Sequence, residues 1–429
     1  MKRGFVFLVL LVAVALLILR SESSRTVLVA QESTTPISTA PASTAPASTA
    51  QTAPAGSKAL GSKAAEESTQ VKDGYVGREV CRECHSENYD LHAMHGHAHT
   101  FALASEEKIA SKFAGREFDY GEPYGRYQYE QDEDGLSVRN PDKREDSFPL
   151  QYALGSGHHA ITLLSLAKDA EKGTVAYEHR GSWFRDRDRL GRTPGQPLTV
   201  PQSESERFGM KHVDNVMQKC IYCHTTTGTV VDQEIVGLTA NVNCEKCHGP
   251  GAEHVQQARL MKDPPSFSVG SGKWDSESEI QLCGDCHRLP EAITLKELRE
   301  YPDKLARFQP VGLLRSKCFI ESEGALRCTT CHNPHKTITA LSETEHVAKC
   351  IQCHQTAHNS QVACPISPAD GCIKCHMPKY DFESLGTGFH DHWIRVHPED
   401  LSVNCVPSQI GVCTRRTTFQ CRPLPSSIR

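Results

Sequence analysis

The chain has 429 residues, of which 38% are apolar and 7% aromatic, and its formal net charge is −5 at pH 7. This mild negative charge, without a basic stripe anywhere along the sequence, excludes the strongly basic class of nucleic-acid-binding proteins. The apolar and aromatic fractions are low for a chain of this length that fills its core with its own side chains. Because the chain also has 19 cysteines and 22 histidines, we expect something other than side chains to fill part of the interior.

Residues 1–30 have the pattern of an export signal. Lys2 and Arg3 precede an apolar run of 15 residues, from Phe5 to Leu19. This run is shorter than the about 20 residues that span a membrane comfortably. Leu28 fits the small-residue pattern before a cleavage site after Ala30 poorly, so a cleaved signal peptide and a retained N-terminal membrane anchor both stay open. In either case we expect the rest of the chain in the periplasm or another extracytoplasmic compartment.

Residues 31–70 are of low complexity and consist mainly of Ala, Pro, Ser and Thr. A segment with so few large apolar residues cannot bury enough surface to fold. We interpret it as a disordered linker between the signal or anchor and the folded part. A segment without any role is the alternative interpretation.

Seven Cys-x-x-Cys-His motifs, numbered 1 to 7 here in chain order, are the main feature of the sequence. At this composition, chance predicts about 0.04 copies of the motif. The two thiols of such a motif add to the two vinyl groups of one haem, and the adjacent histidine binds the iron as its proximal ligand. We therefore predict seven covalently bound haem c groups. The cysteines are Cys81 and Cys84, Cys220 and Cys223, Cys244 and Cys247, Cys283 and Cys286, Cys328 and Cys331, Cys350 and Cys353, and Cys372 and Cys375. The proximal histidines are His85, His224, His248, His287, His332, His354 and His376.

Zinc is the main alternative to haem. The cysteines between Cys220 and Cys247 follow a C-x2-C-x20-C-x2-C spacing, which is close to the zinc-ribbon range. A zinc ribbon, however, gives no reason for a histidine directly after every second cysteine. Structural disulfides would not need that histidine either. The sequence therefore favours haem.

Second axial ligands are expected to be histidines, because 15 histidines lie outside the motifs and the chain has only six methionines. A surface histidine, or one that only hydrogen-bonds a ligand, is the alternative at every position. Four histidines crowd the segment after motif 1, at positions 92, 95, 97 and 99, and His158 precedes a further candidate. The favoured distal ligands are His97, His254, His335 and His392. Further candidates are His159, His212 and His358.

The fold is predicted to be mainly α with much irregular structure, in a cytochrome domain that spans residues 71–398. A His-rich helical segment is expected up to about residue 113. Alternating apolar and polar residues then predict short strands, which form a small β-meander insert at about 113–200, between motifs 1 and 2. The six later motifs follow within about 157 residues, so their haems must lie close together. One longer helix is expected from about Glu291 to Phe308.

Five cysteines lie outside the motifs, namely Cys318, Cys364, Cys405, Cys413 and Cys421. In an oxidising compartment they can pair, and a bridge between Cys318 and Cys364 is our expectation for one of them. Because the number is odd, at least one thiol stays unpaired within the chain. Residues 399–429 have little apolar pattern and are expected to form an irregular tail.

From Cys81 to about Pro398 the chain resembles the multihaem cytochromes related to hydroxylamine oxidoreductase, its tetrahaem acceptor cytochrome and pentahaem nitrite reductase. The segments that carry the resemblance are CRECHSENY, GSGHHA, CEKCHGPGAEH, RSKCFIESEGALRCTTCHNPH, CIKCHMPK and HDHWIR. The resemblance implies His97, His254, His335 and His392 as distal ligands, and a mainly helical core with stacked and perpendicular haem pairs. The chain lacks the CxxCK motif of the nitrite reductases, so their catalytic site is not carried over.

Three functions are compatible with the sequence. An electron carrier with mostly bis-histidine haems would exchange electrons with redox partner proteins or quinol-linked donors. A multihaem oxidoreductase would act on a small nitrogen or sulfur species at a haem with an open axial position. A haem-bearing structural or storage protein is the third. The many histidines outside the motifs favour the carrier, and no catalytic residue is identified.

Overall fold

The computed structural model describes residues 74–143, 147–196, 198–261, 274–299, 305–354, 364, 370–382 and 387–397. All of these ranges belong to one compact unit, which spans residues 60–429. The expected signal or anchor at 1–30, the linker at 31–70 and the tail at 399–429 lie outside the described residues. The same holds for His358, Cys405, Cys413 and Cys421.

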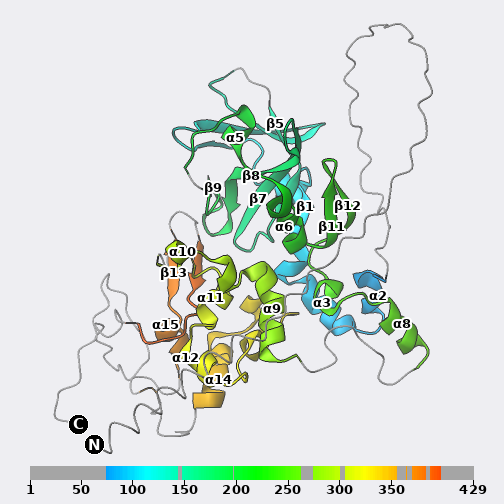
Figure 1. The fold of residues 1–429 in the computed structure, drawn as a ribbon, viewed down its shortest axis with the longest axis vertical. Helices are drawn as coiled ribbons and strands as arrows, with labels where there is room; N and C mark the ends of the chain where they lie inside the picture. Colours follow the sequence, from blue (N-terminus) through cyan, green and yellow to red (C-terminus); the bar gives the residue numbers. More distant parts are fainter. Residues whose placement is uncertain are drawn as a thin grey trace, which may run out of the picture. The chain divides into compact units, whose positions relative to one another are not determined.

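Ten strands between motifs 1 and 2 form two antiparallel sheets, which we call the insert (Figure 1). The six-stranded sheet has the order β1 (Phe101–Leu103), β6 (Tyr152–Leu154), β7 (Ala160–Asp169), β8 (Gly173–Phe184) and β10 (Gly209–His212), and β9 (Arg189–Arg192) pairs with β8 as well. The four-stranded sheet has the order β2 (Glu117–Asp119), β3 (Arg126–Asp132), β4 (Gly135–Arg139) and β5 (Phe148–Leu150). The long strand β8 holds β9 and β10 on one edge, because it pairs with β10 through residues 176–179 and with β9 through residues 181–184.

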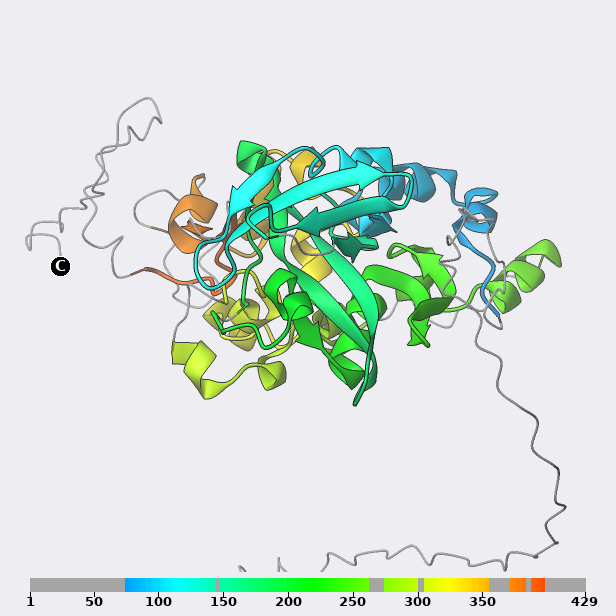
Figure 2. The same ribbon diagram turned by 90° about the horizontal axis from the view of Figure 1, so that it is seen from above.

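The core of the insert lies between its two sheets, which overlap in the view from above (Figure 2). On β3, Tyr127 and Tyr129 are buried while their neighbours are more exposed, as the two-residue period of a strand requires. Opposite them, Ile161 and Leu163 of β7 and Trp183 of β8 close the same core. The short helices α4 (Glu107–Ala110) and α5 (Glu204–Phe208) add further apolar side chains.

A second apolar cluster joins the insert to motif 2. Helix α6 (Asp214–His224) ends in this motif, and its side chains Met217 and Ile221 pack against Leu164 and Leu166 of β7. The hairpin of β11 (Thr225–Val231) and β12 (Glu234–Ala240) follows directly and contributes Val230. The six-stranded sheet is therefore the platform on which the helix of motif 2 rests.

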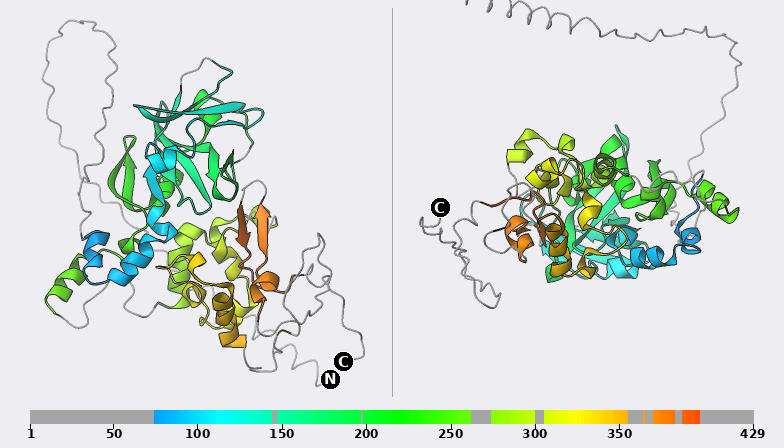
Figure 3. Two further views of the ribbon diagram at one scale, coloured as in Figure 1. Left: turned by 180° about the vertical axis from the view of Figure 1, so that it is seen from behind. Right: turned by 90° about the horizontal axis from the view of Figure 1, so that it is seen from below.

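Each motif lies on a short helix or at its end. The helices with motifs are α2 (Arg78–Arg82), α6, α7 (Cys244–His248), α9 (Ser276–His287), α13 (Cys328–Cys331), α14 (Glu343–His354) and α15 (Cys372–His376). The remaining helices of the described residues are α3 (Ser86–Ala93), η1 (Gly96–His99), η2 (Arg185–Arg187), α8 (Ala252–Arg259), η3 (Pro290–Ala292), α10 (Leu295–Arg299), α11 (Gln309–Leu313), α12 (Lys317–Glu321) and η4 (Ile338–Ala340). The hairpin of β13 (Lys379–Phe382) and β14 (Thr387–His390) follows motif 7, in orange and red (Figure 3).

The part of the chain that follows α8 has few buried apolar side chains. Within the described residues from 274 onward, only seven are buried, whereas the insert alone has many more. They are Ile280, Ile293, Leu305, Ala306, Val311, Leu313 and Val347. This part contains four of the seven motifs. A core so sparse is expected where large apolar cofactors replace side chains.

The prediction of a mainly α fold is wrong, because four antiparallel sheets with 14 strands run through the described residues. The four strands with a clear period of two, now β3, β4, β7 and β8, are present. No periodicity indicated β1, β2, β5, β6, β9 and β10, since each has only three or four residues and is too short to show a period. The insert is consequently no small meander but a pair of stacked sheets.

The continuous helix expected from Glu291 to Phe308 is also wrong. Ile293 is extended, with φ −111° and ψ 128°, and its side chain joins an apolar cluster with Leu305 and Val311. A new helix then begins at Leu295, because Thr294 and Glu297 form a capping box. The His-rich segment after motif 1 is likewise divided, into α3, η1 and α4 with β1 between them.

Within the described ranges, no helix combines the length and the apolarity that a membrane crossing requires.

Candidate functional site

The helical backbone of the motifs brings both thiols and the imidazole to one side. Residues at positions i, i+3 and i+4 of a helix share a face, and this is the spacing of Cys-x-x-Cys-His. In motif 1, the amide of His85 donates to the carbonyl of Cys81 at 2.9 Å, and in motif 5 His332 donates to Cys328 at 3.0 Å. Each motif thus presents two sulfur atoms and one nitrogen to the same space, as covalent haem attachment requires.

Four of the seven motif histidines face a second histidine ring at nearly constant distance. The distances between ring centres are 6.1 Å for His85 and His254, 6.0 Å for His248 and His335, 6.2 Å for His287 and His97, and 6.2 Å for His332 and His392. An iron between two imidazoles separates their centres by about 6 Å, because each Fe–N bond is about 2 Å long and each centre lies about 1 Å behind its nitrogen. These residues therefore fit a haem iron, and they include all four distal histidines that the sequence favoured.

Distance alone does not identify a ligand pair. His92 and His95 are also 6.2 Å apart and stacked, although neither belongs to a motif. His332 has two neighbours at 6.2 Å, His392 and His346, and only one of them can bind opposite it. His346, on α14, was not singled out from the sequence, where nothing but its position four residues before Cys350 could have indicated it.

Hydrogen bonds at Nδ1 orient several of these rings. The Nδ1–H groups of His224, His376 and His392 donate to the backbone carbonyls of Thr100, Arg395 and His390, at 3.2, 3.1 and 3.0 Å. A carbonyl can only accept, so the proton must be on Nδ1 and the lone pair on Nε2 is left for a metal.

Burial keeps four of these histidines neutral, as metal binding requires. Burial lowers the pKa of His97 to about 3 and that of His392 to about 4, and it lowers the pKa of His224 and His287 as well. Neutral imidazoles at ordinary pH are ready to bind without first losing a proton.

The other candidates lie elsewhere. His212 uses its Nε2 in a hydrogen bond of 3.1 Å with Glu178, and His99 uses its Nε2 with the carbonyl of Ala93 at 2.8 Å. His159 lies against Phe389 of β14, with ring centres 5.3 Å apart, next to the hairpin that follows motif 7. Among the described residues, no histidine ring lies about 6 Å from His224, His354 or His376, and His358 is outside these residues.

The variable residues inside the motifs connect one motif to the next. The carboxylate of Glu245 in motif 3 is buried and accepts from the amides of Val76 and Gly77, just before motif 1, at 2.9 Å each. Thr329 of motif 5 donates from its amide and its hydroxyl to Glu279 of the motif 4 helix, at 2.6 and 2.8 Å. The sequence analysis did not consider these residues, because the contacts join segments up to 169 residues apart.

Thiols of different motifs also lie close together. Cys81 lies near Cys244, Cys223 near Cys286, Cys283 near Cys328, and Cys372 near Cys350, close enough in each pair for one thiol to shift the pKa of the other. If each sulfur held one edge of a haem, this proximity would bring together the haem edges of motifs 1 and 3, 2 and 4, 4 and 5, and 6 and 7.

The expected bridge between Cys318 and Cys364 is wrong, because both are free thiols. Cys318 is close enough to Cys331 and Cys353 for their charges to affect its thiol, so it lies near motifs 5 and 6 instead. The reason is that helix α12 places Cys318 next to the haem-binding cysteines rather than next to Cys364.

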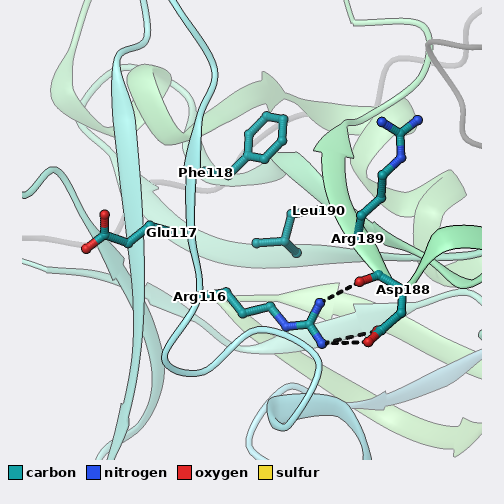
Figure 4. A pocket seen from close by; sticks show the side chains of 6 residues that line it. All are labelled: Arg116, Glu117, Phe118, Asp188, Arg189 and Leu190. Carbon is teal, nitrogen blue, oxygen red and sulfur yellow. Dashed lines mark hydrogen bonds and ion pairs between the residues drawn. The ribbon is translucent and has the colours of Figure 1, made fainter.

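One open pocket lies on the insert, lined by residues of β2, β9 and their neighbours (Figure 4). Arg116 of this pocket is paired with Asp188. It donates one hydrogen bond of 2.8 Å to the Asp188 carbonyl and two of 3.1 Å to the Asp188 carboxylate. No motif residue lines this pocket. It therefore does not supply a substrate site at a haem.

Residues 198–249, which contain motifs 2 and 3, match the family described as cytochrome c554 and c-prime. No curated protein sequence matches the chain. Among solved structures, the outer cell wall cytochrome OcwA is 16% identical, with a TM-score of 0.42, over 75% of this chain and 80% of its own. An undecahaem cytochrome from the S-layer of Carboxydothermus ferrireducens is 13% identical, with a TM-score of 0.37, over 76% of this chain, which spans about half (52%) of that protein.

The motifs and the family match together support a multihaem c-type cytochrome that binds haem c and transfers electrons. The relation to hydroxylamine oxidoreductase and pentahaem nitrite reductase, the number of seven haems and the cellular location stay predictions.

Proposed function

We propose that this protein is an exported electron carrier with seven covalent haem c groups, most of them bound by two histidines. The observation that carries the proposal is the set of four histidine pairs about 6 Å apart, each with one member from a CxxCH motif. An iron with two histidine ligands has no open position for substrate, so its chemistry is the gain and loss of one electron. Residues 71–398 would form the cytochrome domain, after the export signal or anchor at 1–30 and the linker at 31–70.

The pairs support a distal ligand for each of four haems. Motif 1 would use His254, motif 3 His335, motif 4 His97 and motif 5 His392. His159, beside the hairpin that follows motif 7, is our candidate for that motif, and His358 remains a candidate for motif 6. His212 is no longer favoured, because Glu178 occupies its Nε2.

The motif contacts support a conduit. The thiol contacts join motif 1 to 3, and motif 4 to both 2 and 5, while motifs 6 and 7 form a further pair. The exposed cysteines of the described residues are Cys84, Cys353 and Cys375, which belong to motifs 1, 6 and 7. We infer that redox partner proteins or quinol-linked donors meet the haems of these motifs, while the haems of motifs 2 to 5 pass electrons inside the protein.

An oxidoreductase that acts on a small nitrogen or sulfur species is the second candidate, and motif 2 is where it would act. His224 is oriented by Thr100 to bind iron, but among the described residues no histidine ring lies opposite it. A haem held there with one protein ligand could bind a small molecule at the other face.

The test is a haem count and an EPR spectrum of the oxidised protein, purified after export. A denaturing gel stained for haem and an intact mass would establish seven covalent haems, and a mass without them would refute the proposal. A spectrum of low-spin iron alone supports the carrier. A high-spin signal that shifts on addition of nitrite or hydroxylamine would instead refute the pure carrier and support the oxidoreductase.

A further inference from the structure

Three motifs share a contact through the residue before their second cysteine. This residue is Tyr222 in motif 2, Lys246 in motif 3 and Asp285 in motif 4. The ammonium group of Lys246 lies 3.6 Å from the centre of the Tyr222 ring and donates to the Tyr222 carbonyl at 2.6 Å. The Tyr222 hydroxyl in turn donates to the carboxylate of Asp285 at 3.3 Å. Three segments that are separate in sequence are thus linked side chain to side chain.

In the other motifs that we compared, the residue before the second cysteine does not join three motifs. Glu83 of motif 1 pairs with Arg259 at 2.9 Å, and Thr330 of motif 5 bonds the amide of Arg327, three residues before it, at 3.1 Å. Lys374 of motif 7 pairs with Glu343, on the motif 6 helix, at 3.2 Å. A contact among three motifs at this position is therefore found, within the described residues, only for motifs 2, 3 and 4.

The thiols around this contact converge as well. Cys223 of motif 2 lies next to Cys286 of motif 4, and its Sγ donates to the carbonyl of Asp285 at 3.9 Å. Lys246 lies near one thiol of each of the three motifs, namely Cys223, Cys247 and Cys286. Because each thiol marks a haem edge, three haems would meet around this lysine.

The charges of the three residues suit this position. The Tyr222 hydroxyl donates to the Asp285 carboxylate while its ring faces the Lys246 ammonium group, so the tyrosine links the cation to the anion. Lys246 is a cation held against an aromatic ring, an arrangement that fixes the position of its charge. A fixed positive charge favours the reduced state of a nearby haem, since oxidation adds a further positive charge.

We infer that Tyr222, Lys246 and Asp285 form a positioning clamp that holds the haems of motifs 2, 3 and 4 in one three-way junction, and that Lys246 makes these haems easier to reduce. The inference rests on the proposed function, because it requires haems on all three motifs. In this junction an electron from the haem of motif 3 could pass to the haem of motif 2 or to that of motif 4.

The test is a potentiometric titration of the haem-loaded protein, followed by absorbance and EPR. In Lys246→Met, we expect three of the seven haems to shift to more negative midpoint potentials. The matched control is Lys374→Met, which removes a lysine at the same motif position and should shift only the haems of motifs 6 and 7. Lys246→Arg keeps the charge and should restore the potentials. A Lys246→Met titration equal to that of the wild type, or a shift of one haem only, would overturn the junction.

Tyr222→Phe gives a second measurement if Lys246→Met does not fold. It keeps the ring under Lys246 and removes only the hydrogen bond to Asp285. We expect altered EPR line shapes for the coupled haems at an unchanged haem count, and unaltered line shapes would contradict the clamp. If the wild type itself carries no haem on these motifs, the proposed function fails. If it carries seven haems and the variants titrate like the wild type, only the junction fails.

Discussion

The imidazole rings of His248 and His335 lie nearly parallel, at an angle of 4°, with their centres 6.0 Å apart. One ring belongs to motif 3 and the other to the segment just after motif 5. A single iron would thus tie two haem-binding segments together, which makes this pair a direct test of distal ligation.

His335→Ala should convert the motif 3 iron from six-coordinate, low-spin to high-spin, because no other ligand replaces the lost imidazole. EPR of the oxidised protein should show a new high-spin signal that accounts for about one haem in seven. His99→Ala is the control, since the Nε2 of His99 already bonds the carbonyl of Ala93 at 2.8 Å. An unchanged spectrum of His335→Ala would remove His335 from the ligands.

The two neighbours of His332 should behave differently. His392 is held by its own hydrogen bond to the His390 carbonyl, which leaves its Nε2 for the iron of motif 5. We therefore expect His392→Ala to produce a high-spin haem and His346→Ala to leave the spectrum low-spin. The reverse result would assign His346 to this iron.

Glu245→Ala should destabilise the contact between motifs 1 and 3. The Glu245 carboxylate is buried and accepts from three amides, those of Val76, Gly77 and Gly251, at 2.9 Å each. Each buried amide left without an acceptor costs about 1–3 kcal/mol, so we expect a loss of about 3 kcal/mol in unfolding free energy. Thermal unfolding of the haem-loaded protein measures it, with the exposed Glu171→Ala as the control. A change equal to that of the control would show that water replaces the carboxylate.

Tyr129→Phe should destabilise the insert and leave the haems in place. The buried hydroxyl of Tyr129 joins the hydroxyl of Tyr120, at 3.0 Å, to Nε2 of His179, at 2.8 Å. Its removal leaves buried polar groups unpaired, at a cost of about 2–4 kcal/mol. Chemical unfolding followed by tryptophan fluorescence should show the loss, while the haem stain stays unchanged. A parallel loss of haem would mean that the insert supports every motif.

His179 should also make the insert sensitive to acid. Burial lowers its pKa from 6.5 to about 3, so below pH 6.5 the unfolded chain binds a proton that the folded chain does not. The stability that His179 contributes is therefore present above pH 6.5 and is lost as the pH falls toward 3. Between pH 7 and pH 5 the unfolding free energy should fall by about 2 kcal/mol more than in His179→Gln. An equal fall in both proteins would assign the acid sensitivity to other groups.

The seven motifs could be found in the sequence because all three haem-binding side chains of a motif lie within five consecutive residues. It also named the four histidines that lie about 6 Å from a motif histidine, although their role as ligands stays a prediction until it is measured. It missed the true extent of the insert, because strands such as β1 and β9 are too short for a period and form only when β6 or β8 offers a partner. The contacts of Glu245 and Lys246 could not be foreseen either, since they depend on a three-dimensional arrangement of distant segments.

The segment from His97 to Phe101 has three tasks within five residues. His97 faces the motif 4 histidine, the carbonyl and the hydroxyl of Thr100 bond the ring and the backbone of His224 in motif 2, and Phe101 starts strand β1 opposite Leu154. The pairing of Phe101 with β6 therefore helps to position His97 and Thr100, which precede it directly in the chain. Strand β1 and the surroundings of two motif histidines are thus built from the same short segment. A substitution that breaks the pairing of Phe101 with β6 would therefore also disturb the residues around His224 and His287.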